Sequence, residues 1–158
     1  MRAFRVILIA VSVAVLAQQP PLQAAMENAV QRAEPGWKCN HVILSIPLDP
    51  HQKPLFGETW ERTLSSGQQE DVLLIVVQAD SLEEARRDFD LRFRRGNLAA
   101  GWNSERINIG EDGHISTYKD GKGVGIDFRK GSIMVHINGR SHRQMAQRLA
   151  ELVDRVAP

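Results

Sequence analysis

Five side chains in the C-terminal half of the chain could do chemistry together, because they include imidazole, carboxylate, phenol and guanidinium groups. They are His114, Tyr118, Asp127, Arg129 and His136. Alternate residues of a β-strand point to the same face of its sheet. In the register that the turns predict, all five fall on one face, where they would form the predicted ligand-binding site.

Two alternatives remain for this polar face. His114, Asp127 and His136 could hold a metal ion, but zinc sites need three or four ligands at good distances, so we expect no metal. The solvent face of an antiparallel sheet also carries alternating polar side chains without any function. No catalytic residue is predicted.

Cys39 is the single cysteine, so it cannot form a disulfide within the chain. In an exported protein an odd cysteine indicates an intermolecular disulfide or a buried thiol. His41 lies two residues further on, and therefore on the same face of a strand. A buried, small apolar residue is the expected role for Cys39, and the intermolecular disulfide stays open.

The N-terminal segment predicts export. Arg2 and Arg5 precede an almost unbroken apolar run over residues 6–17. This run has the length of a signal-peptide core and is shorter than the ~20 apolar residues of a spanning helix. We expect a signal peptide over residues 1–25 and a periplasmic or extracellular protein without a stable membrane span. An uncleaved anchor is the alternative.

Two signal cleavage points, after Ala17 and after Ala25, fit the small residues that a signal peptidase recognises. Cleavage after Ala25 would have the larger Gln23 at one recognised position. It would also remove the start of a helix, because apolar residues at helical spacing begin at Leu22. The mature chain is expected to be one α+β domain, assigned to residues 26–158.

The charge balance argues against a nucleic-acid partner. The 158-residue chain has a formal net charge of +1, and two of its arginines belong to the signal segment. A nearly neutral chain has no overall field that would attract nucleic acid. The expected partner is a protein or a small molecule.

No motif in the chain specifies a reaction. H-E-x-x-H, G-x-S-x-G and the glycine patterns of phosphate and dinucleotide sites are all missing. We therefore expect a non-catalytic binding or accessory module without a cofactor. The alternatives are a small metal- or ligand-dependent enzyme that uses the polar sheet face, and an oligomerising structural component of the cell envelope.

Two main helices should pack on the sheet that carries these side chains. Ser81 and Glu84 form a capping box at the start of the first helix, and Gly96 ends it. Ser141 and Gln144 form the same motif at the start of the C-terminal helix. Both helices carry an apolar stripe at helical spacing.

Residues 105–138 predict a four-strand meander, because turn residues separate runs of alternating apolar side chains. The tip of the last hairpin is expected at Lys130-Gly131. The predicted cross-strand pairs are Phe128 with Ile133, Ile126 with Val135, Thr117 with Ile126, and Ile107 with Thr117.

The apolar run at residues 72–77 indicates a further strand, buried on both faces. Residues 47–58, with three prolines, are expected to form a loop. The predicted fold class is α+β: an antiparallel sheet of five or six strands with a C-terminal four-strand meander and two main packing helices.

The C-terminal part, about residues 105–156, resembles small exported bacterial proteins of unknown function. The resemblance is carried by turn and strand sequences, which are Gly110-Glu111-Asp112-Gly113, Phe128-Arg129-Lys130-Gly131, Val135-His136-Ile137-Asn138-Gly139 and Leu149-Ala150. The segment is also loosely similar to the sheet-and-helix modules of the PsbP-like class. That resemblance implies an accessory or sensor domain and assigns no catalytic residue.

Overall fold

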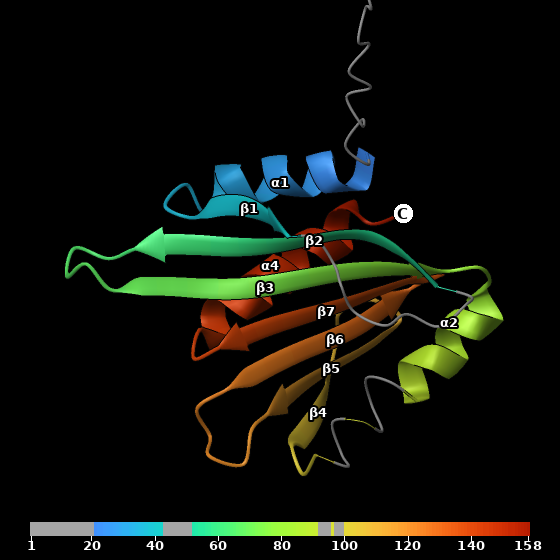
Figure 1. Cartoon of the computed structure of the whole chain (residues 1–158). Helices are drawn as coiled ribbons and strands as arrows, with labels where there is room; N and C mark the ends of the chain where they lie inside the picture. The colour runs from blue at the N-terminus through green and yellow to red at the C-terminus, as the bar shows by residue number, and fades with distance from the viewer. Residues whose placement is uncertain (1–20, 43–51, 92–95, 97–99) are drawn as a thin grey trace, which may run out of the picture.

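The computed structural model describes residues 21–42, 52–91, 96 and 100–158. They form a seven-stranded antiparallel sheet in the order β1-β2-β3-β7-β6-β5-β4 (Figure 1). The strands are β1 (Lys38–Val42), β2 (Gln52–Thr63), β3 (Gln69–Ala79), β4 (Asn103–Ile107), β5 (Asp112–Thr117), β6 (Val124–Lys130) and β7 (Ile133–Arg140). The helices of the described part are α1 (Pro21–Ala33), α2 (Leu82–Asp88) and α4 (Arg143–Val156).

The predicted sheet of five or six strands with a C-terminal four-strand meander is wrong, because the sheet has seven strands. Strand β2 occupies much of the segment that was expected to be a proline-rich loop. Pro54 is tolerated there because the register shifts between Pro54 and Phe56, and a bulge lacks the regular ladder hydrogen bond. The last four strands pair in chain order, but β7 also pairs with β3, so they are part of one larger sheet.

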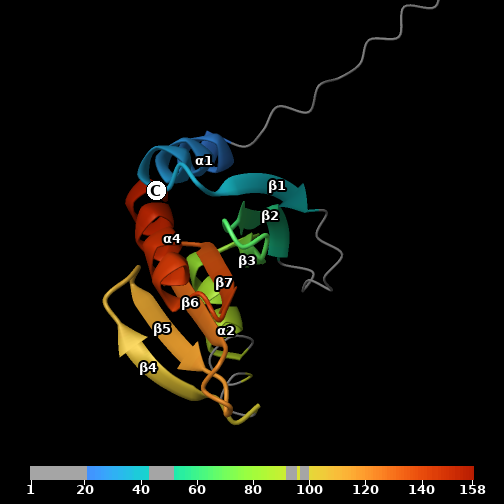
Figure 2. The ribbon, with the colours of Figure 1, turned by 90° about the vertical axis from the view of Figure 1, so that its left-hand side faces the viewer.

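The helices lie on both faces of the sheet (Figures 1 and 2). α1 and α4 cover the face that carries Ile126, Phe128 and Val135, and all three of these side chains are fully buried. α2 packs on the opposite face, where its Ala85 and the following Phe89 belong to a smaller apolar cluster with Met134. The helix expected to begin at Leu22 is α1, and its buried Met26 and Val30 make it a third helix of the main core beside the two main packing helices that were predicted.

The hairpin registers differ from the predicted ones by an even number of residues. Phe128 pairs with Val135, because the last hairpin turns at residues 131–132 and Lys130 is still paired. Ile126 pairs with Ile115 where Thr117 was expected. An even shift leaves every side chain on its predicted face and changes only its neighbours across the strands.

The predicted signal segment, residues 1–25, lies outside the described residues except for its last five. Those five belong to α1, so a cut after Ala25 would fall inside this helix. No helix in the described part of the chain is both long enough and apolar enough to cross a membrane.

Candidate functional site

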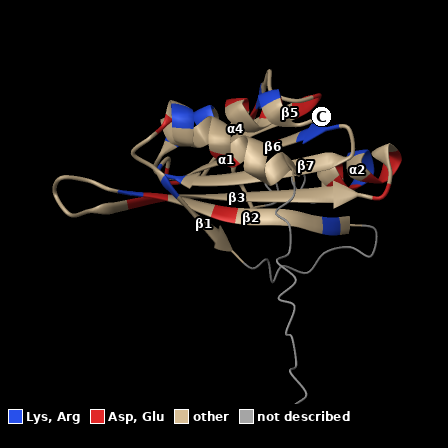
Figure 3. Ribbon diagram, turned by 90° about the horizontal axis from the view of Figure 1, so that it is seen from above, with Lys and Arg blue, Asp and Glu red and all other residues tan. Residues whose placement is uncertain are grey.

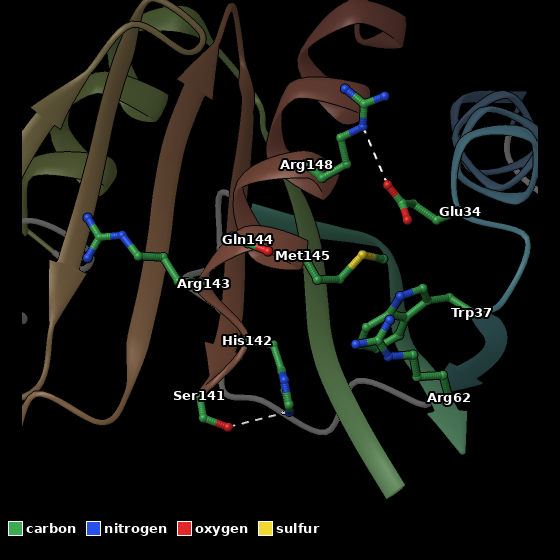
Figure 4. A pocket seen from close by; sticks show the side chains of 9 residues that line it. All are labelled: Glu34, Trp37, Arg62, Ser141, His142, Arg143, Gln144, Met145 and Arg148. Carbon is green, nitrogen blue, oxygen red and sulfur yellow. Dashed lines mark hydrogen bonds and ion pairs between the residues drawn. The ribbon is translucent and has the colours of Figure 1, made fainter. Parts of the chain in front are cut away.

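A cavity of about 480 Å³ opens beside the N-terminus of α4 (Figure 4). The ribbon at this end of α4, remote from the C-terminus of the chain, has the colour of Lys and Arg positions (Figure 3). The cavity is bordered by residues from three parts of the chain that are far apart in the sequence: the segment after α1, strand β2, and the start of α4 with the turn before it. Its lining residues are Glu34, Trp37, Arg62, Ser141, His142, Arg143, Gln144, Met145 and Arg148.

One wall of the cavity is a guanidinium group held in place by an aromatic ring and a carboxylate. The guanidinium carbon of Arg62 lies 4.8 Å from the centre of the Trp37 ring, which is a cation–π contact. Arg62 Nε donates to Glu70, and Nδ1 of His142 lies 3.5 Å from the other carboxylate oxygen of Glu70. Glu70 thus fixes both basic side chains, and Arg62 keeps further N–H donors for a ligand.

The N-terminus of α4 has no side-chain cap, so the predicted capping box of Ser141 and Gln144 is wrong. The N-cap residue is His142, and Ser141 Oγ lies 3.4 Å from the His142 ring and makes no bond to the helix. The first turn also has no acidic residue. Its backbone N–H groups therefore depend on solvent or a ligand, and the positive end of the helix dipole favours an anion.

The backbone of the turn before α4 is constrained at Gly139 and Arg140. Arg140 has a φ of 46°, in the left-handed region, and its backbone N–H donates to Asn138 Oδ1 at 3.1 Å. A Cβ atom added to Gly139 would lie 2.6 Å from Ala146 Cβ and 2.8 Å from Val124 Cγ1. The close approach of β7, β6 and α4 at Gly139 holds the first turn of α4 at the cavity.

The remaining arginines differ in what they offer to a ligand. Arg148 is held by exposed, long ion pairs, 3.6 Å from Glu34 and 3.5 Å from Glu151. Such pairs are worth only about 0–1 kcal/mol, so Arg148 can change partner at little cost. Arg143 extends away from Trp37 and lies near Thr117 (Figure 4). Arg62 and Arg148 are therefore the guanidinium groups that flank the cavity.

The structure brings together three of the residues predicted on the polar sheet face. Asp127 lies directly opposite His114 on one side and His136 on the other. Asp127 is 1% exposed, and its Oδ1 lies 2.5 Å from His136 Nδ1. His114 instead bonds to Asp112 at 3.0 Å, and its ring is 6.2 Å from that of Phe89, the C-cap residue of α2.

The other two predicted residues have different neighbours. Arg129 is buried and donates to Glu111 at 2.6 Å. Tyr118 packs edge-on against Trp102, with ring centres 4.1 Å apart. Trp102 also lies above Gly125, with its Cζ3 3.4 Å from the place that a Cβ atom would take. The predicted ligand-binding role of this face stays a prediction.

Cys39 is half-buried on β1, beside the carboxylates of α1 and β2. Its Sγ is 4.0 Å from Glu27 Oε1. Burial, together with the nearby charges of Glu58 and Glu27, raises the pKa of the thiol far above its ordinary value. The intermolecular disulfide through Cys39 stays a prediction.

Sequence reasoning missed the cavity and its key residues Trp37, Arg62 and Glu70. One local signal pointed to it: the last helix begins with basic residues and has no acidic residue in its first turn, against the preference of the helix dipole. The rest of the site depends on the pairing of distant strands. A comparison of the chain with models of protein families, with curated proteins and with solved structures finds no match. The resemblance to the PsbP-like class therefore stays a prediction.

Proposed function

We propose that the protein is an exported, non-catalytic binding module whose ligand is a small carboxylate or phosphate compound. The observation that carries the proposal is the uncapped start of the 14-residue helix α4, which opens into a cavity flanked by Arg62 and Arg148. Export is supported by the basic and apolar residues at the start of the chain.

The electrostatics of the cavity favour an anionic group. Free backbone N–H groups and a guanidinium are both strong donors to carboxylate and phosphate oxygens. Trp37 is 3% exposed and its ring is covered by Arg62, so it serves as a support for the arginine. A cavity of about 480 Å³ has a size typical of small-molecule sites. The ligand is therefore expected to be a compact anion.

A Ser–His–Glu chain at the cavity favours a second candidate function, ester hydrolysis. Ser141 Oγ lies 3.4 Å from His142 Nε2, and His142 Nδ1 lies 3.5 Å from Glu70. In that reaction the serine attacks the ester carbonyl while the histidine accepts its proton and passes it to the departing alcohol, and water then cleaves the acyl-serine bond to release the acid. Binding is the better-supported role, because both distances are long for aligned hydrogen bonds and Glu70 also holds Arg62. Covalent labelling of Ser141 by a fluorophosphonate would make ester hydrolysis the better-supported function.

The proposed function is tested by calorimetric titration with inorganic phosphate and with succinate. Gln144 is exposed in the first turn of α4, so Gln144→Glu places a carboxylate where the ligand anion would bind. We expect the variant to keep its thermal stability, because the helix dipole favours the new charge, and to lose at least tenfold in affinity. Gln147→Glu, one turn further along α4, is the charge-matched control and should bind as the unmodified protein does.

Two outcomes would overturn the proposal. One is a failure of the unmodified protein to bind either anion. The other is equal affinity in the Gln144→Glu and Gln147→Glu variants, because binding would then occur away from the N-terminus of α4.

A further inference from the structure

A second group of titratable side chains lies between α1 and the β1 edge of the sheet, and the proposed anion site does not use it. It consists of Glu27 on α1, Cys39 and His41 on β1, and Glu58 on β2. One donor atom from each residue lies within 4.8 Å of the other three. An imidazole, a thiol and two carboxylates are the side-chain ligands of borderline transition-metal ions.

The sheet register places three of these residues together. Cys39 and His41 are alternate residues of β1 and share a face, and His41 lies directly opposite Glu58. α1 crosses this face and brings Glu27 to it, with Oε1 2.6 Å from His41 Nε2 and 4.0 Å from Cys39 Sγ. The donors therefore converge from three elements.

Glu58, the fully buried member of the cluster, has only neutral hydrogen-bond donors among the partners that the described residues give it. Glu58 is fully buried, and its oxygens accept from Gln23 at 2.9 Å and from Trp60 at 3.0 Å, both neutral donors. Among the described residues, no Lys or Arg forms an ion pair with Glu58. One carboxylate oxygen of Glu58 lies within 4.8 Å of one of Glu27. Two close carboxylates in a buried place favour a bound cation.

We propose that Glu27, Cys39, His41 and Glu58 form a binding site for a divalent transition-metal ion, with zinc as the expected occupant. Four protein ligands complete a tetrahedral shell, which is typical of structural zinc. Donor separations in such a shell are roughly 3.3–3.8 Å, given bonds of about 2.0–2.3 Å. Small side-chain movements would close the cluster, and binding would release the Cys39 proton to solvent. The ion would tie α1 to β1 and β2.

The first test is titration of the full-length, tag-free, chelator-treated protein with zinc in competition with a chromophoric chelator. We expect one equivalent to bind and to raise the melting temperature. Glu58→Gln should weaken binding at least tenfold, while removal of a buried charge keeps the metal-free protein folded. Glu61→Gln is the matched control, because Glu61 is also on β2 but pairs with Asn40. Its zinc affinity should be unchanged.

The second test uses cobalt as a spectroscopic probe of the ligands. A thiolate-to-cobalt charge-transfer band is expected in the unmodified protein and should be lost in Cys39→Ser. Failure to bind zinc, equal zinc affinity in Glu58→Gln and Glu61→Gln, or a charge-transfer band that survives Cys39→Ser would each overturn the proposal.

Discussion

Asp127 and His136 face each other across β6 and β7, with Asp127 Oδ1 2.5 Å from His136 Nδ1. The carboxylate is 1% exposed, whereas the imidazole side chain is 23% exposed. The pair therefore links a fully buried carboxylate to an imidazole that solvent can reach. A hydrogen bond of this kind is stronger when the groups are charged, and it is costly to break from one side.

The first prediction concerns this pair. His136→Leu should destabilise the protein by roughly 1–3 kcal/mol, because it removes one hydrogen-bond partner of the buried Asp127 carboxylate. Asp127→Asn in the same chain should restore much of that loss, since the buried group is then neutral. Urea unfolding of the two single variants and the double variant gives the coupling free energy. A His136→Leu protein as stable as the unmodified one would contradict the prediction.

The second prediction is a pH dependence of stability at Glu111. Its hydrogen bond from the Arg129 guanidinium, and another from the Gly131 backbone N–H, lower the pKa of the carboxyl group. A lowered pKa adds stability above the unfolded-state value of ~4.3, and that stability disappears as the pH falls through the folded-state value. Glu111→Gln should therefore cost up to about 1 kcal/mol at neutral pH, since the pair is partly exposed.

The check on Glu111 is urea unfolding at pH 7 and at a pH below the folded-state pKa. The difference between Glu111→Gln and the unmodified protein should shrink as the pH falls. A difference that is equal at both pH values would show that the carboxylate charge is not its source.

The third prediction tests the close approach at Gly139. Gly139→Ala should destabilise the protein by about 1–3 kcal/mol, because the new methyl group would meet Ala146 and Val124. Ala146→Gly in the same chain removes one of these contacts and should recover part of the loss. Gly36→Ala is the control, since an added Cβ there meets nothing within 4 Å. Equal thermal stability of the two alanine variants would contradict the packing argument.

The fourth prediction concerns processing of the chain. Cleavage after Ala25 would remove Gln23, which is 5% exposed and donates to Glu58. It would also remove the first turn of α1. We therefore predict cleavage after Ala17, so that N-terminal sequencing or intact-mass measurement of the mature chain would give Gln18 as its first residue. A mature chain that begins at Met26 would contradict this expectation.

Local chemistry explains what could be predicted about the fold. Ser81 does cap α2, because its hydroxyl accepts the Glu84 N–H at 3.1 Å within one turn of chain. The same reasoning failed at Ser141, where the left-handed Arg140 turns the chain so that His142 becomes the N-cap residue. A Ser-x-x-Glu or Ser-x-x-Gln motif predicts the N-cap correctly at Ser81, and it fails at Ser141 because the conformation of the preceding residue moves the start of the helix.

The candidate sites divide in the same way. Cys39 and His41 could be placed on one strand face from their spacing, but their carboxylate neighbours Glu27 and Glu58 come from other elements. Asp127 was predicted on the correct face, whereas its direct opposition to His136 was not, because the hairpin tip lies one residue further along the chain than the turn chemistry indicated.

Which side chains of the C-terminal strands face the core could be read from the residues alone, because alternation along a strand has a period of two and survives an even shift of register. Which residues contact one another across the sheet could not be read in this way. β3 pairs with β7 across a long stretch of chain, and this pairing sets Glu70 beside His142 and brings Arg62 to the start of α4. Contacts of that kind depend on the order of the strands in the sheet. The packing of the whole sheet sets this order, and a local sequence pattern does not predict it.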